Sequence, residues 1–284
     1  MLSYRHAFHA GNHADVLKHC ILVQLLRHLN QKDKPYWVVD THAGAGSYRL
    51  DSEQAAKNRE YEEGIARLWT REDLPPALAD YVAAVRAING GGKLRVYPGS
   101  PRLAMQLMRP QDRLRLFELH SSDAVLLQRD FARAFADEGN RFAIAEADGF
   151  ASLKSVLPPP PRRGLVLIDP AYEDKRDYHR VIAALKEGLA RFATGIYALW
   201  YPQLQRGELH PLLEKLKKLP ADAWLHASLT VRRPADDGFG MHGSGMFIVN
   251  PPWQLRETLE TTLPYLVQAL GQDDGAGFAL EAQE

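Results

Sequence analysis

Runs of hydrophobic residues bounded by polar residues, glycine or proline recur along the chain and predict β-strands. The most continuous run, residues 164–168, opens with a glycine and is followed by Asp169-Pro170. A run without polar alternation is typical of a strand in the centre of a parallel sheet, where both faces are buried. We predict further strands over residues 36–40, 114–118, 142–146, 195–201, 224–232 and 245–250.

Hydrophobic residues at helical spacing separate most of these strands. The first such segment, residues 14–29, predicts a helix capped by Asn12, with Asp15 as its capping-box partner. Ser100 before Pro101 predicts the N-cap of another helix. Alternating strands and helices, ending in two strands joined by a glycine-rich loop, predict an α/β fold with a doubly wound, seven-stranded sheet. We expect this sheet to be mostly parallel, with an antiparallel last strand. The remaining predicted helices cover residues 122–136, 150–157, 177–192 and 207–218.

Residues 50–97 interrupt the alternation. Helical spacing over residues 60–69 and 78–88 predicts a small helical insertion there. We therefore expect residues 1–49 and 98–284 to form one domain, with residues 1–12 as an N-terminal arm and residues 50–97 as an inserted subdomain. Long insertions at a functional edge usually shape substrate access.

Composition narrows the class of protein. The 284 residues are 45% hydrophobic, which suffices for a sizeable core. Lys+Arg and Asp+Glu number 35 each, so a nucleic-acid partner would have to meet a local basic patch. The single cysteine, Cys20, excludes an internal disulfide framework and a cysteine-based zinc site. Because no hydrophobic run approaches the length of a membrane span or resembles a signal peptide, we expect a soluble, cytoplasmic protein.

The N-terminal segment is rich in histidine and aromatic residues. A closed zinc site needs four convergent ligands, and no carboxylate-rich partner accompanies His6 and His9, so we expect no metal. Tyr4, Arg5 and Phe8 instead suit contact with the phosphates and bases of a nucleic acid. Five of the 11 histidines lie in this segment: His6, His9, His13, His19 and His28.

A glycine-rich turn follows the first predicted strand. Asp40 ends the strand, His42 projects from the turn, and Gly44 and Gly46 let the backbone approach a ligand closely. The third glycine of the dinucleotide-binding pattern would fall at Arg49, so the sequence does not favour a nicotinamide or flavin oxidoreductase.

Two segments compete for the reactive edge of the sheet: Asp169-Pro170-Ala171-Tyr172 and Asn250-Pro251-Pro252-Trp253. In open α/β sheets, ligands bind beyond the carboxyl ends of the parallel strands. Asn250 follows a strand expected to run antiparallel, which would place it at the opposite edge from the glycine turn. Chain order therefore favours Asp169.

Six blocks together resemble one family: residues 2–6, 11–19, 40–46, 97–101, 147–150 and 197–202. Through these blocks the chain is similar to S-adenosylmethionine-dependent amino-methyltransferases. It more closely resembles bacterial 23S ribosomal RNA adenine-N6 methyltransferases with a helical subdomain inserted in a Rossmann-like domain. The resemblance runs along nearly the whole chain.

The resemblance implies a role for individual residues. Glu118 would accept hydrogen bonds from the cofactor ribose, Asp148 would lie at its adenine, and Lys18 or His19 would hold its methionine carboxylate. The catalytic residues implied are Asp169, Pro170 and Tyr172, and those implied to contact RNA are Tyr4 and His6. The implied S-adenosylmethionine contacts are Lys18, His19, His42, Gly44, Ser100, Glu118, Asp148, Gly149 and Asp169. The usual Asp-Pro-Pro-Tyr motif is changed at Ala171, a change that removes no reacting group.

The implied activity is N6-methylation of one adenine in 23S ribosomal RNA, as a step of rRNA processing. Asp169 and the carbonyl of Pro170 would accept the two amine N–H bonds, while Tyr172 stacks on the base. The base must be unstacked to react, which favours a single-stranded or loop segment. Methylation of DNA adenine or cytosine, methylation of protein glutamine, and noncatalytic RNA binding remain open alternatives.

Overall fold

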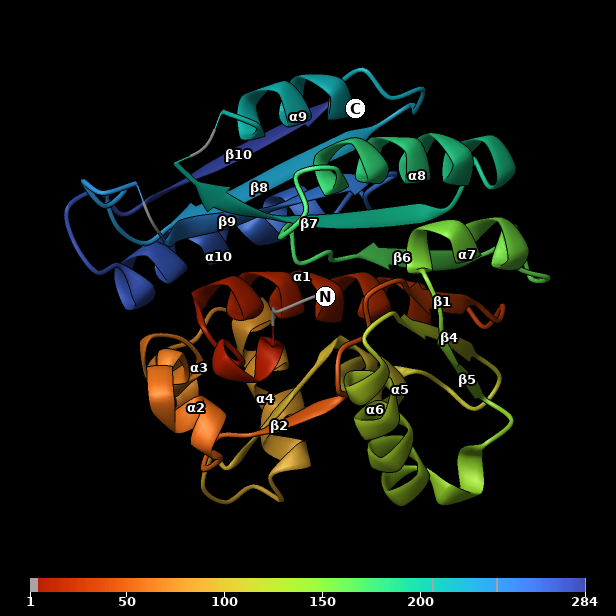
Figure 1. The fold of residues 1–284 in the computed structure, drawn as a ribbon, viewed down its shortest axis with the longest axis horizontal. Coiled ribbons are helices and arrows are strands. Elements are labelled where there is room, and N and C mark those ends of the chain that lie inside the picture. Colours follow the sequence, from red (N-terminus) through yellow and green to blue (C-terminus); the bar gives the residue numbers. More distant parts are fainter. Residues whose placement is uncertain (1–4, 206, 239, 284) are drawn as a thin grey trace.

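A mostly parallel β-sheet forms the centre of the computed structural model, which describes residues 5–205, 207–238 and 240–283 (Figure 1). Its strand order is β10-β8-β9-β7-β6-β1-β4-β5. The five strands from β5 to β7 in this order pair in parallel, whereas β9 is antiparallel to both β7 and β8. The strands are β1 (Trp37–Asp40), β4 (Arg113–Glu118), β5 (Phe142–Glu146), β6 (Gly164–Ile168), β7 (Ile196–Leu204), β8 (Trp224–Thr230), β9 (Met241–Val249) and β10 (Gly277–Gln283).

All seven predicted strands are present, and the antiparallel direction of β9 is confirmed. The predicted strand count is wrong, because β10 adds an eighth strand, antiparallel to β8, at the edge of the sheet. Helix α10 (Leu255–Leu270), which precedes β10, was not predicted either, and Pro264 lies inside it.

Helices cover both faces of the sheet (Figure 1). Leu165 and Leu167 of β6 join the hydrophobic core on one face, while Val166 and Ile168 join the core on the other. The prediction that this strand is buried on both faces is confirmed. One face carries α1 (His13–Asn30), α5 (Ser100–Leu107), α6 (Ser121–Ala134) and α10; the other carries α7 (Gly149–Val156), α8 (Asp177–Arg191) and α9 (Leu209–Leu216).

Four short helices lie between β2 (Ser47–Arg49) and β3 (Val96–Pro98), which pair antiparallel. Leu78 and Tyr81 are fully buried in the core that includes α1, so this segment packs tightly on the main sheet domain. The continuous helix expected over residues 60–69 is interrupted at Gly64, whose backbone angles (φ −123°, ψ −112°) are not helical. A Cβ atom on Gly64 would lie 2.1 Å from the carbonyl oxygen of Gly11, so this close approach requires glycine. The four helices are α2 (Glu53–Asn58), η2 (Glu60–Glu63), α3 (Ile65–Trp69) and α4 (Pro76–Ile88).

The predicted helix caps have mixed outcomes. Asn12 caps α1, because its Oδ1 accepts hydrogen bonds from the amides of Ala14 and Asp15. The capping-box role of Asp15 is wrong, since its Oδ2 accepts from the amide of Gly11 instead. Ser100 is also not a cap: it is the first residue of α5, and its hydroxyl donates to Asp40. Among the described helices, none is long and apolar enough to cross a membrane.

Candidate active site

A cavity of about 940 Å³ lies at the carboxyl ends of β1, β4 and β6. Its walls come from α1, the loops after these strands, β7, the β8–β9 hairpin and the helices between β2 and β3. This is the edge at which open α/β sheets bind ligands, and a pocket of this size is at the upper end of the range for one small ligand.

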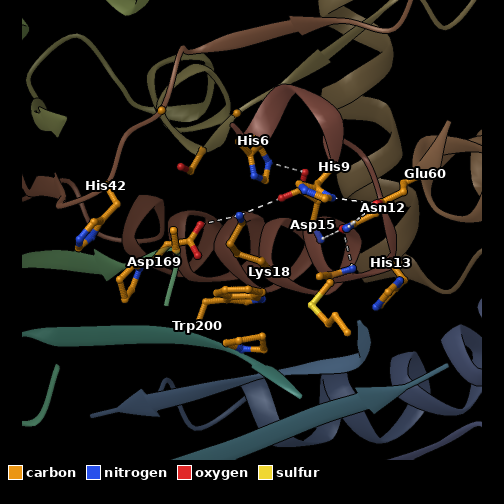
Figure 2. A pocket seen from close by; sticks show the side chains of 18 of the residues that line it. His6, His9, Asn12, His13, Asp15, Lys18, His42, Glu60, Asp169 and Trp200 are labelled. Carbon is orange, nitrogen blue, oxygen red and sulfur yellow. Dashed lines mark hydrogen bonds and ion pairs between the residues drawn. The ribbon is translucent and has the colours of Figure 1, made fainter. Parts of the chain in front are cut away.

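Lys18 occupies the floor of the cavity between two carboxylates (Figure 2). Its Nζ lies 2.6 Å from Asp169 Oδ2 and 2.8 Å from Asp15 Oδ1. Burial alone would lower the pKa of Lys18, but the two carboxylates raise it above its ordinary value. Lys18 is therefore a permanent cation, and it holds one oxygen of Asp169 in place. Within the described residues, Asp169 Oδ1 accepts no hydrogen bond.

Asp15 connects Lys18 to the N-terminal arm. Its Oδ2 lies 2.9 Å from His6 Nε2 and accepts a 2.8 Å hydrogen bond from the amide of Gly11. Burial would raise the pKa of Asp15, yet neighbouring His6 and Lys18 hold it well below its usual value. His6, Asp15, Lys18 and Asp169 thus form a continuous polar network across the cavity (Figure 2).

The glycine turn and the end of β4 meet at one side of the cavity. Gly44 and Gly46 both have positive φ angles, of 61° and 84°, which glycine adopts without strain. The amides of Gly44 and His120 donate to the two oxygens of Glu118, at 2.8 and 2.7 Å. Burial raises the pKa of Glu118 above its ordinary value, against these two hydrogen bonds.

Asp40 and His42 lie beneath the turn. Ser100 donates a 2.6 Å hydrogen bond to Asp40 Oδ2, and the amide of His42 donates to Oδ1. Burial raises the pKa of Asp40 to about 7 despite these donors. Burial also lowers the pKa of His42 to about 4, so its ring is neutral at physiological pH, and it packs edge-on against Phe150.

His19 is buried deeper than expected for a ligand-binding residue. Its Nδ1 lies 2.8 Å from the hydroxyl of Tyr97, which in turn contacts the hydroxyl of Tyr81 at 2.9 Å. Burial lowers the pKa of His19 to about 3, so it carries no charge with which to bind a carboxylate. Its role is thus tied to the tyrosines behind the cavity wall.

Asp148 and Gly149 lie beside the cavity and do not line it. Asp148 caps α7 and is ion-paired with Arg180, which does line the cavity and lies 4.6 Å above the ring of Phe150. A Cβ atom on Gly149 would lie 1.9 Å from the carbonyl oxygen of Thr41. Glycine at this position therefore lets α7 pack against the first βα loop.

Tyr172, the residue expected to stack on the target base, does not present its ring to the cavity. It is 2% exposed, has a positive φ of 53°, and donates a 2.9 Å hydrogen bond to the carbonyl oxygen of Trp200. The ring that lines the cavity is that of Trp200, whose centroid lies 5.7 Å from Lys18 Nζ. The left-handed backbone at Tyr172 turns its side chain away from the cavity and into the core beneath Trp200.

The competing segment lies elsewhere. Asn250 follows antiparallel β9, whose last residue, Val249, pairs with Tyr197 and Trp224 at the amino ends of β7 and β8. Asn250 donates to the carbonyl oxygens of residues 193 and 195, and it does not line the cavity. Its place at the opposite edge agrees with the reasoning from chain order.

Comparisons with known proteins show which family the chain is similar to. Residues 33–280 match the family model described as "Ribosomal RNA large subunit methyltransferase D, RlmJ". The chain belongs to this family. Ribosomal RNA large subunit methyltransferase J of Escherichia coli K12 is 49% identical over 94% of this chain and 93% of its own length. The protein of the same name from Haemophilus influenzae is 46% identical over 99% and 98%. A solved structure from Legionella pneumophila has a TM-score of 0.88 at 34% identity, covering 97% of this chain and 98% of its own.

Most of the site residues predicted from the sequence line the cavity, and a few do not. Those that line the cavity are His6, Lys18, His19, His42, Gly44, Ser100, Glu118, Asp169 and Pro170. Asp148, Gly149 and Tyr172 do not line it, and Tyr4 lies outside the described residues. In the described residues, no group of three or more His, Cys, Asp or Glu side chains could hold a metal ion.

The cavity residues that the sequence does not identify as site residues include Asp15, Arg180 and Trp200. The sequence gives Asp15 a role only as a capping-box residue, although it lies within residues 11–19, a block that carries the family resemblance. Arg180 lies within a helix with an ordinary amphipathic pattern, and nothing local shows that it reaches Asp148. Trp200 belongs to a block that carried the family resemblance, and that block was the available signal.

Proposed function

We propose that this chain transfers the methyl group of S-adenosylmethionine to the N6 amine of one adenine in 23S ribosomal RNA. The observation that carries the proposal is Asp169. One of its oxygens is fixed by Lys18, while the other faces the cavity without a partner among the described residues. The names of the two curated relatives, together with their coverage of the chain, support large-subunit ribosomal RNA as the substrate class.

The residues around the glycine turn suit the cofactor. Glu118 offers carboxylate oxygens for ribose hydroxyls, and its backbone donors leave further lone pairs available. The neutral ring of His42 and the Arg180–Phe150 pair provide flat surfaces beside them for a heterocycle. When bound, the cofactor supplies an electrophilic methyl group on a sulfonium ion. We propose that Ser100, through Asp40, and Gly44 shape the same chamber.

Lys18 supports a different role from the predicted capture of the methionine carboxylate. Both carboxylates it contacts belong to the protein, and they already neutralise its charge. We propose that Lys18 instead holds the Asp169 carboxylate in a fixed orientation through their 2.6 Å contact, as preorganised electrostatics requires.

The exocyclic amine of adenine is a weak nucleophile, because its lone pair is delocalised into the ring. Asp169 Oδ1 and the carbonyl of Pro170 would accept its two N–H bonds and align the nitrogen with the methyl group. Methylation would make an amine proton strongly acidic, and Asp169 would accept that proton. Alignment and preorganisation carry the rate here, since a carboxylate is a weak base.

Trp200 is the better-placed aromatic platform for the target base. Its ring lines the cavity beside Lys18, whereas Tyr172 is buried and holds the Trp200 backbone. Stacking of a base on such a ring is worth roughly 1–3 kcal/mol. The base must leave its own stack to reach the ring, so we propose a single-stranded or loop segment as the substrate. We also propose that the protein acts in the cytoplasm, where it would meet this substrate. The helices of residues 50–97 would form a subdomain that shapes access of the RNA to the cavity.

Radiolabelled methyl transfer tests the proposal. The purified protein is incubated with labelled S-adenosylmethionine and with separate fractions of undermodified 23S RNA, DNA and protein, and nucleosides are then analysed. We expect label only in RNA, as N6-methyladenosine. Label in DNA, in cytosine or in protein would contradict the proposed substrate, and RNA retention without methyl incorporation would contradict the proposed catalysis.

A further inference from the structure

The cavity continues past the proposed reaction site. From Lys18 it follows α1 back to His13, five residues earlier and so roughly 7.5 Å along the helix axis. Figure 2 shows His13 on the side of Lys18 away from Asp169 and His42. This distance is comparable to one step along an extended polynucleotide strand. The lining residues at this distal end include His13, Arg67, Arg232, Met241 and Gln272.

His13 is built into this end of the cavity with an unused polar atom. Its side chain is 7% exposed, and its Nε2 is buried with no hydrogen-bond partner among the described residues. Burial lowers the pKa of His13 to about 4, which leaves a neutral ring. A rotation of the ring would present this buried atom to the cavity, and a neutral imidazole offers one donor and one acceptor, which suits the edge of a nucleobase.

Arg232 is the second feature. It is exposed, and it donates a 3.3 Å hydrogen bond to the carbonyl oxygen of Met241. No ion pair joins it to a carboxylate in the part of the chain that the structure describes. By contrast, Arg67 nearby is paired with Glu63 and also donates to the carbonyl oxygen of Gly271. The positive charge of Arg232 therefore remains available to an anion.

We propose that this distal end, which we call the flanking subsite (His13, Arg232 and Met241), binds the nucleotide next to the target adenine. Arg232 would contact its phosphate, while His13 and Met241 would contact its base. The inference rests on the proposed function and deepens it, because it assigns a second nucleotide of the substrate to the same cavity. Phosphate contacts fix the register of a bound strand, so the subsite would position the target base over Asp169.

The neighbouring arginine provides a matched control. Arg233 is also exposed, but it is ion-paired with Asp274 and does not line the cavity. Arg232→Ala and Arg233→Ala therefore remove the same charge at adjacent positions, one inside the proposed subsite and one outside it.

Binding is measured by fluorescence anisotropy with a short, labelled oligouridine strand that carries one central adenine, in the presence of S-adenosylhomocysteine. We expect Arg232→Ala to weaken binding about tenfold, as for the loss of one charge-assisted contact. It should also reduce the slope of log affinity against log salt by about 0.7, the value for one phosphate contact on a single strand. Arg233→Ala should change neither quantity.

A second set of strands tests the base contact. Removing the base on one side of the adenine should weaken binding to the unsubstituted protein, and His13→Phe should abolish that difference. Equal effects of the two arginine substitutions on binding would overturn the proposed subsite. So would equal affinity of the unsubstituted protein for the intact strand and for both strands that lack a base beside the adenine. Because these assays measure binding, they judge the subsite separately from methyl transfer, which judges the proposed function.

Discussion

Among the substitutions considered, that of Lys18 is expected to cause the largest loss of unfolding free energy. The chain contains a second lysine in nearly the same local geometry, Lys217, which provides a control. Lys217 Nζ lies 2.6 Å from Glu281 Oε2 and 5.6 Å from the Trp224 ring centroid, close to the 2.6 Å and 5.7 Å of Lys18 with its partners. The two differ in burial, because the Lys18 side chain is 5% exposed and that of Lys217 is 28% exposed.

Substitution by methionine keeps the length of the side chain and removes the charge. Lys18→Met removes the cation that Asp15 and Asp169 share, and Asp15, which is only 1% exposed, keeps only its contacts with His6 and the amide of Gly11 among those described. Loss of one partner from a buried ion pair costs about 3–5 kcal/mol of unfolding free energy. Lys217→Met breaks a pair whose glutamate is 47% exposed, and there the expected loss is about 0–1 kcal/mol.

The loss should also depend on pH. In the unsubstituted protein the pKa of Asp15 is depressed in the folded state, so its favourable contribution is present above about pH 4 and is lost at lower pH. Without Lys18, the pKa of Asp15 is less depressed, because His6 and the amide of Gly11 alone oppose the effect of burial, and protonation relieves the buried charge as the pH falls. The difference between Lys18→Met and the unsubstituted protein should therefore be largest near neutral pH and should shrink towards pH 4.

Urea denaturation of the three proteins, followed by tryptophan fluorescence at neutral and acidic pH, measures these differences. Equal losses for Lys18→Met and Lys217→Met would refute the reasoning, because burial would then not govern the cost. A loss for Lys18→Met that grows on acidification would refute the assignment of Asp15 as the uncompensated charge.

Two further predictions concern Asp40 and Gly149. The folded-state pKa of Asp40, raised to about 7, means that its ionisation destabilises the native state as the pH rises from about 4 to 7. Asp40→Asn retains an acceptor for Ser100, so the stability of this variant relative to the unsubstituted protein should increase by about 2–3 kcal/mol between pH 5 and pH 8; a pH-independent difference in urea titrations would contradict the raised pKa. Gly149→Ala should destabilise the fold by about 1–3 kcal/mol, because its Cβ would overlap the carbonyl oxygen of Thr41. An unchanged melting temperature would show that α7 can shift away from the first βα loop.

The sequence was sufficient for the elements with strong, local patterns. The hydrophobic run ending at Asp169 identified the central strand, and chain order separated Asp169 from Asn250 correctly. The C-terminal elements α10 and β10 escaped prediction for different reasons. Pro264 interrupts the helical pattern of α10, and β10 has an edge-strand pattern that acquires meaning only through its pairing with β8.

The details of the site depended on contacts between distant segments. Ser100 has the local signature of a helix cap, yet its hydroxyl is used by Asp40, 60 positions away in the sequence. Tyr172 is the last residue of the motif that predicts stacking on the base. Its positive φ angle, which cannot be predicted from the residue type, directs its ring into the core. The pairing of Lys18 with Asp169 spans 151 positions and depends on the fold, which brings α1 beside the loop that follows β6.

The central claim is that Asp169 accepts the amine of the target adenine at the carboxyl edge of the sheet. The most direct test compares methyl transfer to 23S RNA by Asp169→Ala and Asn250→Ala, with binding of S-adenosylmethionine measured in parallel by calorimetry. We expect Asp169→Ala to lose transfer by at least about a thousandfold while it still binds the cofactor, and Asn250→Ala to retain transfer. Near-normal transfer by Asp169→Ala, or loss of transfer by a folded Asn250→Ala protein, would contradict the claim.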